Sequence, residues 1–101
     1  GNLVNIQVIS NELPGTYSLS QNYPNPFNPV TNIEFGVPET SALTLKVYDI
    51  SGREVQTLVN GIMNAGNYEI GFNAGNLASG VYFYRMESGS FISVKKLVIL
   101  K

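Results

Sequence analysis

Apolar and polar residues alternate along most of this sequence of 101 residues, and turn-forming clusters interrupt the alternation roughly every ten residues. Nowhere do apolar residues keep helical spacing over a run long enough for a helix. A period of two places successive side chains on opposite faces of a strand, so that one face can be buried. The pattern therefore predicts an all-β sandwich of about seven short antiparallel strands.

Two hairpins are predicted with their turns. Residues 43–47 and 53–59 flank the turn 49–52, in which Gly52 can adopt the positive φ that a tight reversal requires. Residues 81–87 and 91–100 flank Ser88-Gly89-Ser90 in the same way. Further strands are expected at residues 4–9, 17–23, 31–37 and 67–72.

A tyrosine motif bears on the topology. Leu77, Gly80 and Tyr82 form Leu-x-x-Gly-x-Tyr at the start of a predicted strand. In Greek-key sandwiches a tyrosine at such a corner donates its hydroxyl to the backbone a few residues upstream. The motif therefore favours two sheets joined by crossovers, although Tyr82 could also be an ordinary strand residue with its hydroxyl in water.

Composition excludes several classes of function. The chain has no Cys and no His, which removes thiolate and imidazole metal sites, disulfides, a Cys nucleophile and a Ser-His-Asp triad. Six basic residues and a net charge of -1 provide no basic stripe for nucleic acid. No apolar run approaches the roughly 20 residues of a membrane span, and no signal peptide opens the sequence, so an export signal is expected on a longer precursor.

The seven carboxylates are well separated, since no two lie within four residues of each other. Glu34 and Glu69 fall at outward positions of their strands, which predicts solvated side chains. A glycosidase-like pair assembled in space stays open. No calcium-loop pattern is present, and we expect neither a metal nor a cofactor.

Three of the five prolines fall within one short run, Tyr23-Pro24-Asn25-Pro26-Phe27-Asn28-Pro29. Each proline restricts the backbone and removes an N–H donor, so this run cannot be a central strand. One interpretation is a rigid connection in which Tyr23 and Phe27 plug the open end of the sandwich and the asparagines bond locally. The other is a recognition loop.

The last eleven residues form a strand that alternates, turns basic and then becomes continuously apolar before a terminal lysine. Three of the six basic residues lie here. Lysines on an edge strand can block unwanted pairing, although the edge formed by Phe91 to Leu100 could also pair between copies of the chain. Alternatively, a strand at this edge can be captured by strand addition and by recognition of its terminus.

Four sequence blocks stand out in order along the chain. They are Tyr23 to Pro29 as given above, Leu45-Lys46-Val47-Tyr48-Asp49 with Gly52-Arg53-Glu54-Val55, Leu77-Ala78-Ser79-Gly80-Val81-Tyr82-Phe83-Tyr84, and Lys95-Lys96-Leu97-Val98-Ile99-Leu100-Lys101. In this order the blocks closely resemble the C-terminal sorting domain of proteins exported by the type IX secretion system, in its type A form. The resemblance extends from about Leu13 to Lys101, which predicts a sorting domain at residues 13–101 and a linker or edge strand at residues 1–12.

The resemblance implies an Ig-like sandwich without enzymatic activity, at the end of a secreted protein of the Bacteroidetes or related phyla. It implies passage through the periplasm and the outer-membrane translocon, with cleavage by a gingipain-like sortase and surface attachment in many members. The residues expected to be read are Gly80, Tyr82, Lys95, Lys96, Leu97, Val98, Ile99, Leu100 and Lys101.

Other functions are weighed against this one. A carbohydrate-binding or adhesive sandwich would use exposed tyrosines, for which Tyr17, Tyr48, Tyr68 and Tyr84 are the candidates. A third possibility is a module that stabilises its parent protein. An enzyme is the weakest interpretation, because no catalytic constellation is visible in the sequence.

Overall fold

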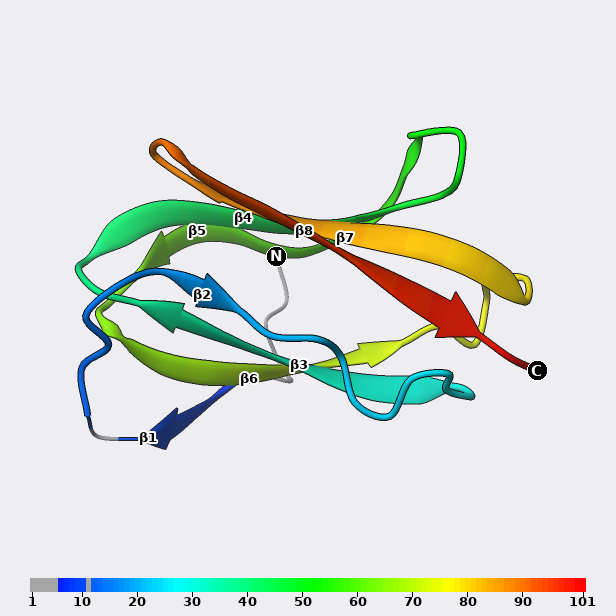
Figure 1. The fold of residues 1–101 in the computed structure, drawn as a ribbon, viewed down its shortest axis with the longest axis horizontal. Helices are drawn as coiled ribbons and strands as arrows, with labels where there is room; N and C mark the ends of the chain where they lie inside the picture. Colours follow the sequence, from blue (N-terminus) through cyan, green and yellow to red (C-terminus); the bar gives the residue numbers. More distant parts are fainter. Residues whose placement is uncertain (1–5, 11) are drawn as a thin grey trace.

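The computed structural model describes residues 6–10 and 12–101, and these residues form two packed β-sheets (Figure 1). The eight strands are β1 (Ile6–Ser10), β2 (Ser18–Leu19), β3 (Val30–Val37), β4 (Ser41–Tyr48), β5 (Glu54–Met63), β6 (Gly66–Asn73), β7 (Gly80–Ser88) and β8 (Phe91–Ile99). The predicted all-β sandwich is confirmed, with eight strands instead of seven.

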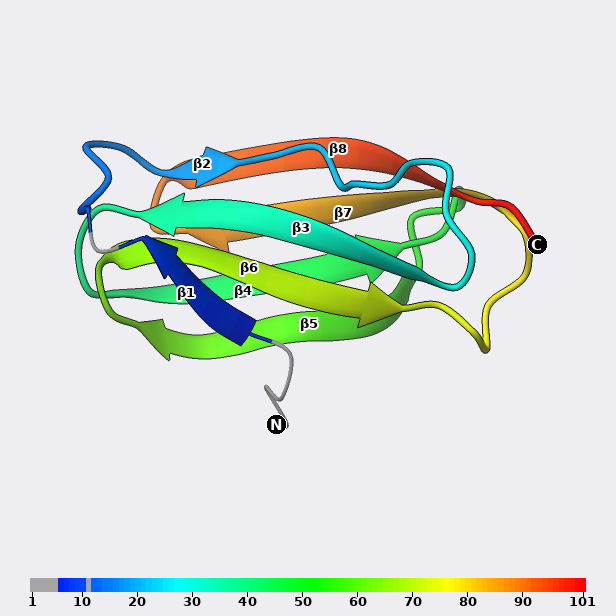
Figure 2. The same cartoon turned by 90° about the horizontal axis from the view of Figure 1, so that it is seen from below.

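The first sheet has the strand order β1-β6-β3-β2 and the second has β5-β4-β7-β8, with antiparallel pairing throughout. The chain crosses between the sheets after β3, after β5 and after β6. Consequently β6 returns beside β3, and β7 returns beside β4. This return of a fourth strand to the first is the predicted Greek-key arrangement. Figure 2 shows β2 and β8 along the same side of the sandwich.

The core lies between the sheets and comes from the inward positions of each alternating strand. In β3 the inward side chains are Thr31, Ile33, Phe35 and Val37, and in β7 they include Tyr82, Tyr84 and Met86. Burial of these apolar faces supplies the main driving force for folding. Ring pairs such as Phe35 with Tyr68, whose centroids lie 5.4 Å apart, add packing between neighbouring strands.

Both predicted hairpins are confirmed. β4 pairs with β5 and β7 pairs with β8. Gly52 has φ +88° and Gly89 has φ +58°, the left-handed conformation that turns demand of glycine. The expected strand at 17–23 is shorter, because beyond Leu19 the chain bonds to β3 only through the Ser20 N–H and an isolated bridge between Tyr23 and Asn32. In the first predicted strand, residues 4 and 5 lie outside the described residues, while Ile6–Ser10 pairs with β6.

The predicted tyrosine corner is present. The Tyr82 hydroxyl donates to the carbonyl of Ala78 at 2.9 Å, where the chain crosses from β6 to β7. A second corner, which the sequence analysis missed, lies at the crossover from β5 to β6, where the Tyr68 hydroxyl donates to the Asn64 carbonyl at 2.7 Å. Both tyrosines follow a glycine by two residues, so Gly66-x-Tyr68 repeats Gly80-x-Tyr82 and could have revealed the second corner.

We predict that Tyr82→Phe and Tyr68→Phe each lower the free energy of unfolding by about 1 kcal/mol, the usual net value of one hydrogen bond. Each substitution removes the bond across one crossover and keeps the buried ring. Tyr48→Phe is the matched control, because none of the described residues bonds its hydroxyl. Urea unfolding measures the three values, and equal midpoints for all three variants would contradict the prediction.

Candidate functional site

The proline run and the last strand, which are far apart in the sequence, are hydrogen-bonded to each other. Phe27 forms a parallel bridge with Ile99. Its N–H donates to the Val98 carbonyl at 3.1 Å, and its carbonyl accepts from the Leu100 N–H at 3.0 Å. The Val98 N–H donates to Oδ1 of Asn25 at 3.0 Å. The run therefore acts as a short additional strand beside the end of β8.

This contact closes only part of the β8 edge. Gln21, just before the run, donates from Nε2 to the Lys96 carbonyl at 2.6 Å. From Lys96 to Leu100 the outer edge of β8 is thus occupied by residues 21–27. Along this half, strand addition, one of the two interpretations of the last strand, is blocked, because the outward backbone groups already have partners.

The proline run is held down by Phe27 and by a small buried polar group. Phe27 is 3 % exposed, and its ring centroid lies 6.0 Å from that of Phe72. The side chain of buried Asn22 donates to Thr31 Oγ1 at 3.1 Å and to the Pro24 carbonyl at 3.2 Å, and Thr31 donates to the same carbonyl at 2.7 Å. These bonds satisfy polar groups that would be costly to bury alone.

Two expectations for this run need correction. Phe27 plugs the sandwich as predicted, but Tyr23 is 80 % exposed and plugs nothing. Its backbone pairs with Asn32, which turns the ring outward from the sheet edge. Asn25 was expected to bond locally, yet its side chain bonds to Val98, 73 residues away in sequence. Sequence distance conceals such a bond, because only the packed sandwich brings the two segments together.

Tyr84 anchors residues 20–22, which lead into the proline run, to the core. This fully buried β7 residue donates its hydroxyl to the Ser20 carbonyl at 2.6 Å and accepts from the Asn22 N–H at 2.8 Å. Burial raises the pKa of Tyr84 to about 12, although the Asn22 hydrogen bond opposes the shift. The hydroxyl therefore stays protonated and continues to donate across the whole physiological pH range.

The other side of β8 meets the corner motif. Gly80 pairs with Ile99 and Tyr82 pairs with Leu97. Beyond the strand, the Lys101 N–H donates to Ser79 Oγ at 3.0 Å, and Lys101 Nζ donates to the Gly75 carbonyl at 2.8 Å. The structure thus brings together the candidate residues of the last strand, the corner and the proline run. We call this assembly the β8 clasp, made of residues 21–29, 79–82 and 95–101.

Charges are divided between the two sheets. All six basic residues lie on the second sheet, its turns or the chain end. Three carboxylates on this sheet pair with three of them: Glu54 lies 3.3 Å from Lys46, Asp49 lies 3.1 Å from Arg53, and Glu87 lies 3.1 Å from Arg85, the last without the alignment of a hydrogen bond. Within residues 6–10 and 12–101, Lys95, Lys96 and Lys101 make no ion pair.

The remaining carboxylates belong to the first sheet and its loops. Glu34 and Glu69 are directly opposite each other on its outer face, and Glu12 and Glu39 lie in connections. Among the carboxylates of the described residues, only Glu34 and Glu69 face each other across paired strands. In the same part of the chain, no group of three Asp or Glu could hold a metal ion. Like charges opposite each other weaken a strand pair slightly. Because neither carboxylate forms an ion pair within the described residues, this face carries negative charge.

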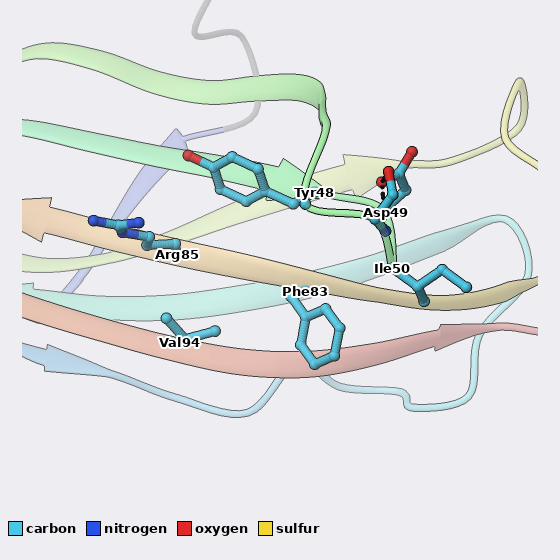
Figure 3. Close-up of a pocket in the computed structure, with 8 residues that line it drawn as sticks. Tyr48, Asp49, Ile50, Phe83, Arg85 and Val94 are labelled. Carbon is cyan, nitrogen blue, oxygen red and sulfur yellow. Dashed lines mark hydrogen bonds between the residues drawn. The ribbon is translucent and has the colours of Figure 1, made fainter.

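A groove of about 470 Å³ lies on the outer face of the second sheet, next to β8 (Figure 3). Its floor comes from Tyr48, Phe83, Arg85 and Val94 on three neighbouring strands, and the turn 49–52 forms one wall. The lining combines apolar and aromatic surface with the Arg85 guanidinium, which is paired with Glu87, and with the Asp49 carboxylate. Such a groove can take an apolar side chain.

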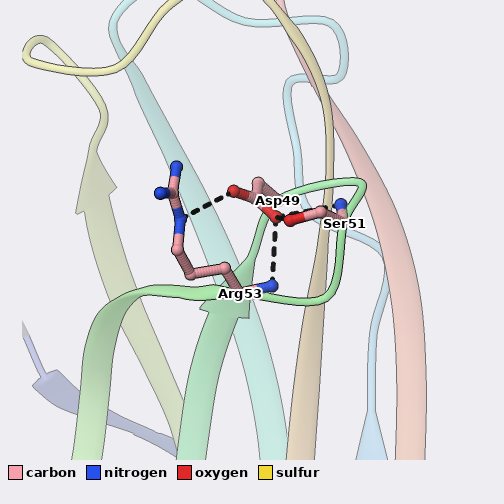
Figure 4. Close-up of polar contacts among 3 residues, drawn as sticks. All are labelled: Asp49, Ser51 and Arg53. Carbon is pink, nitrogen blue, oxygen red and sulfur yellow. Dashed lines mark hydrogen bonds and ion pairs between the residues drawn. The ribbon is translucent and has the colours of Figure 1, made fainter.

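The turn beside this groove is organised by Asp49 (Figure 4). One carboxylate oxygen accepts from Ser51 Oγ at 2.6 Å, from Ser51 N at 2.9 Å and from Arg53 N at 3.0 Å. The hydrogen bond from the Ser51 hydroxyl, followed by that from the Arg53 backbone, lowers the pKa of Asp49 below its ordinary value. The ionised carboxylate therefore keeps the turn closed at neutral pH.

The family model described as the secretion system C-terminal sorting domain matches residues 21–100. The chain belongs to this family. The sorting domain directs a protein through the type IX secretion system to the cell surface or the medium. Family membership implies an interaction with that system and a cargo on the N-terminal side of the same chain. No curated protein matches the sequence. Within the described residues, no helix is long and apolar enough to cross a membrane.

Two of the four tyrosines considered for sugar binding lie in the core. Tyr68 and Tyr84 are buried at inward positions of β6 and β7, which contradicts the expectation that they are exposed. Tyr17 is half-buried and stacks on Phe91, with ring centroids 5.2 Å apart. Tyr48 lies on the outer face of the second sheet, in the groove. The carbohydrate-binding alternative is not supported, because the four tyrosines do not share one exposed face.

We predict that Tyr84→Phe lowers the free energy of unfolding of the sorting domain by about 2 kcal/mol, because the Asn22 N–H and the Ser20 carbonyl lose their partner. Tyr23→Phe is the matched control within the proline run and should change the midpoint very little, since its side chain is exposed. Urea unfolding with amide exchange of Asn22 measures both effects. Unchanged protection of Asn22 in Tyr84→Phe would contradict the role assigned to the hydroxyl.

We predict a pH-dependent effect of Asp49→Asn. Because the folded pKa of Asp49 is lowered, the stability that its ionised form contributes is present above about pH 4 and is lost as pH falls through the folded pKa. Asp49→Asn should therefore have a lower urea midpoint than the parent at pH 7, and the gap should narrow below about pH 4. A gap that stays constant from pH 7 to about pH 2 would refute the assignment.

Proposed function

We propose that the β8 clasp is the part of the sorting domain that the outer-membrane translocon reads. The residues in question are Gly80, Tyr82 and Lys95 to Lys101, supported by the proline run Tyr23 to Pro29. The observation that carries the proposal is the direct hydrogen bonding of Phe27 and Asn25 to Val98 and Leu100. These bonds join the proline run and the last strand, the two most unusual segments of the sequence, into one folded surface.

The shape of this surface depends on the fold. Leu97 and Ile99 are buried, whereas Lys96, Leu100 and Lys101 are exposed beside the proline run. A translocon that contacts this surface would therefore recognise a folded strand with fixed neighbours, and the inward residues would act by holding the outward ones in place. The unpaired lysines give the surface a positive charge that a complementary partner can use for orientation.

The proposal extends to the domain boundary and to later steps. Residues 13–101 form the sorting domain, and residues 1–12 are the linker or edge strand that leads from the cargo. The sorting domain acts without catalysis, a view supported by the absence of His and Cys from the chain. A gingipain-like sortase removes the domain after export and attaches the cargo to the surface.

Deletion of residues 94–101 tests the proposal. The chain is fused behind a reporter that carries a signal peptide, in a bacterium with a type IX secretion system. Deletion should leave the reporter in the periplasm, because the strand to be read is missing. Fractionation and immunoblotting measure its location. Secretion of the shortened fusion at the level of the intact one would sink the proposal.

A second variant separates recognition from folding. Replacing Lys95 and Lys96 by Gln removes only charges and is expected to leave the melting temperature nearly unchanged, since within the described residues neither side chain forms an ion pair. Secretion of this variant should fall. Glu34→Gln with Glu69→Gln on the opposite sheet is the control and should be secreted normally.

A further inference from the structure

The N-terminal half of β8 is an open sheet edge. In β8 the backbone groups of even-numbered residues point away from β7, as the bonds of Lys96, Val98 and Leu100 to residues 21–27 demonstrate. The two-residue period of a strand places the N–H and C=O groups of Ile92 and Val94, and the N–H of Lys96, on the same side. Within residues 6–10 and 12–101 these groups have no backbone partner.

The open edge has a defined end. The Gln21 side chain occupies the Lys96 carbonyl, and from there onward residues 21–27 cover the strand. A strand added to this edge can therefore pair along Ile92–Lys96 and must stop at Gln21. At roughly 3.3 Å per residue, this segment offers space for about five residues.

The side chains along the open edge are apolar on one face and basic at its end. Ile92 is 54 % exposed and Val94 is 53 % exposed, although exposed apolar residues on an edge strand invite pairing. Val94 also forms part of the groove with Tyr48, Phe83 and Arg85 (Figure 3). A side chain of an added strand that lies beside Val94 would reach this groove, which supplies a pocket next to the backbone pairing.

The distribution of charged side chains indicates what kind of segment can pair with the open edge. The acidic residues of the second sheet are already paired with Lys46, Arg53 and Arg85, which leaves Lys95 and Lys96 uncompensated beside the open edge. An incoming segment that carries carboxylates is attracted by these two lysines. A second copy of the chain would instead bring its own uncompensated lysines to the same edge, so repulsion disfavours self-pairing.

We propose that Ile92–Lys96 is a strand-addition site for an extended acidic segment of a partner protein, with alternate apolar side chains on the face of Val94 and carboxylates on the opposite face, toward Lys95. Backbone hydrogen bonds supply much of the affinity, and the groove and the lysines supply the specificity. This inference rests on the proposed sorting function, for which it specifies the chemistry of one partner segment.

The test uses the 101-residue chain and a capped pentapeptide that alternates glutamate and valine. Binding should increase the amide-exchange protection of Ile92, Val94 and Lys96 about tenfold at saturation and should weaken as salt is raised. A pentapeptide that alternates lysine and valine is the control and should give no protection. Absence of protection by the acidic peptide, or equal protection by both peptides, overturns the inference.

Substitutions locate the site. Val94→Pro removes one outward N–H and leaves the ladder with β7 intact, because the Val94 N–H points away from β7. It should weaken peptide binding about tenfold, whereas the matched variant Val94→Thr, which keeps the N–H, should bind nearly as the parent does. Lys96→Glu should also weaken binding and does not depend on proline being tolerated. Equal affinity for all three variants overturns the inference.

Two further outcomes are decisive. Dimers of Val94→Thr but not of Val94→Pro in sedimentation experiments would identify a second copy as the occupant and overturn the choice of an acidic partner. In the reporter assay, normal secretion of a Val94→Pro fusion that no longer binds the peptide would overturn the partner role and leave the sorting function intact. The sorting function fails separately, when deletion of residues 94–101 leaves secretion unchanged.

Discussion

The hydrogen bonds between the proline run and the end of β8 are the contact on which the organisation of this domain depends. They link Asn25 and Phe27 to Val98 and Leu100, which are among the last residues of the chain. A strand at the edge of a sheet is prone to fray, because one side of its backbone has no partner. Here the second side is supplied by a loop that prolines have stiffened, so less conformational entropy is lost when the loop is ordered.

Tyrosine hydroxyls provide further restraints in a chain without cysteine, two of them local bonds at the crossovers and one between distant segments. Tyr68 and Tyr82 fasten two crossovers between the sheets, and Tyr84 fastens the approach to the proline run. Each ring is buried while its hydroxyl bonds to a backbone carbonyl, which couples packing to a directional contact. The clasp is thus supported from within the core, and its exposed residues are held in position by buried ones.

The charged side chains contribute more to the orientation of a partner than to the stability of the fold. Exposed ion pairs on the second sheet are worth little individually, but they neutralise its carboxylates and leave positive charge near the chain end. The opposite face carries Glu34 and Glu69. A partner therefore meets a domain with two distinct faces, and the weakly charged composition conceals this polarity until the strands are assembled.

The sequence alone determined the fold class, both hairpins, the corner at Tyr82 and the family, because each depends on residues close together in the chain. Alternation sets which side chains face inward, and glycines mark the reversals. Only the tertiary structure decided that Asn25 bonds to Val98, that Tyr23 is exposed, and that Tyr84 is buried with its hydroxyl on Ser20. These features depend on which strands become neighbours, and a crossover topology brings together residues that no local pattern relates. The division of the last strand into a closed half and an open half has the same origin, since it depends on where the proline run comes to lie.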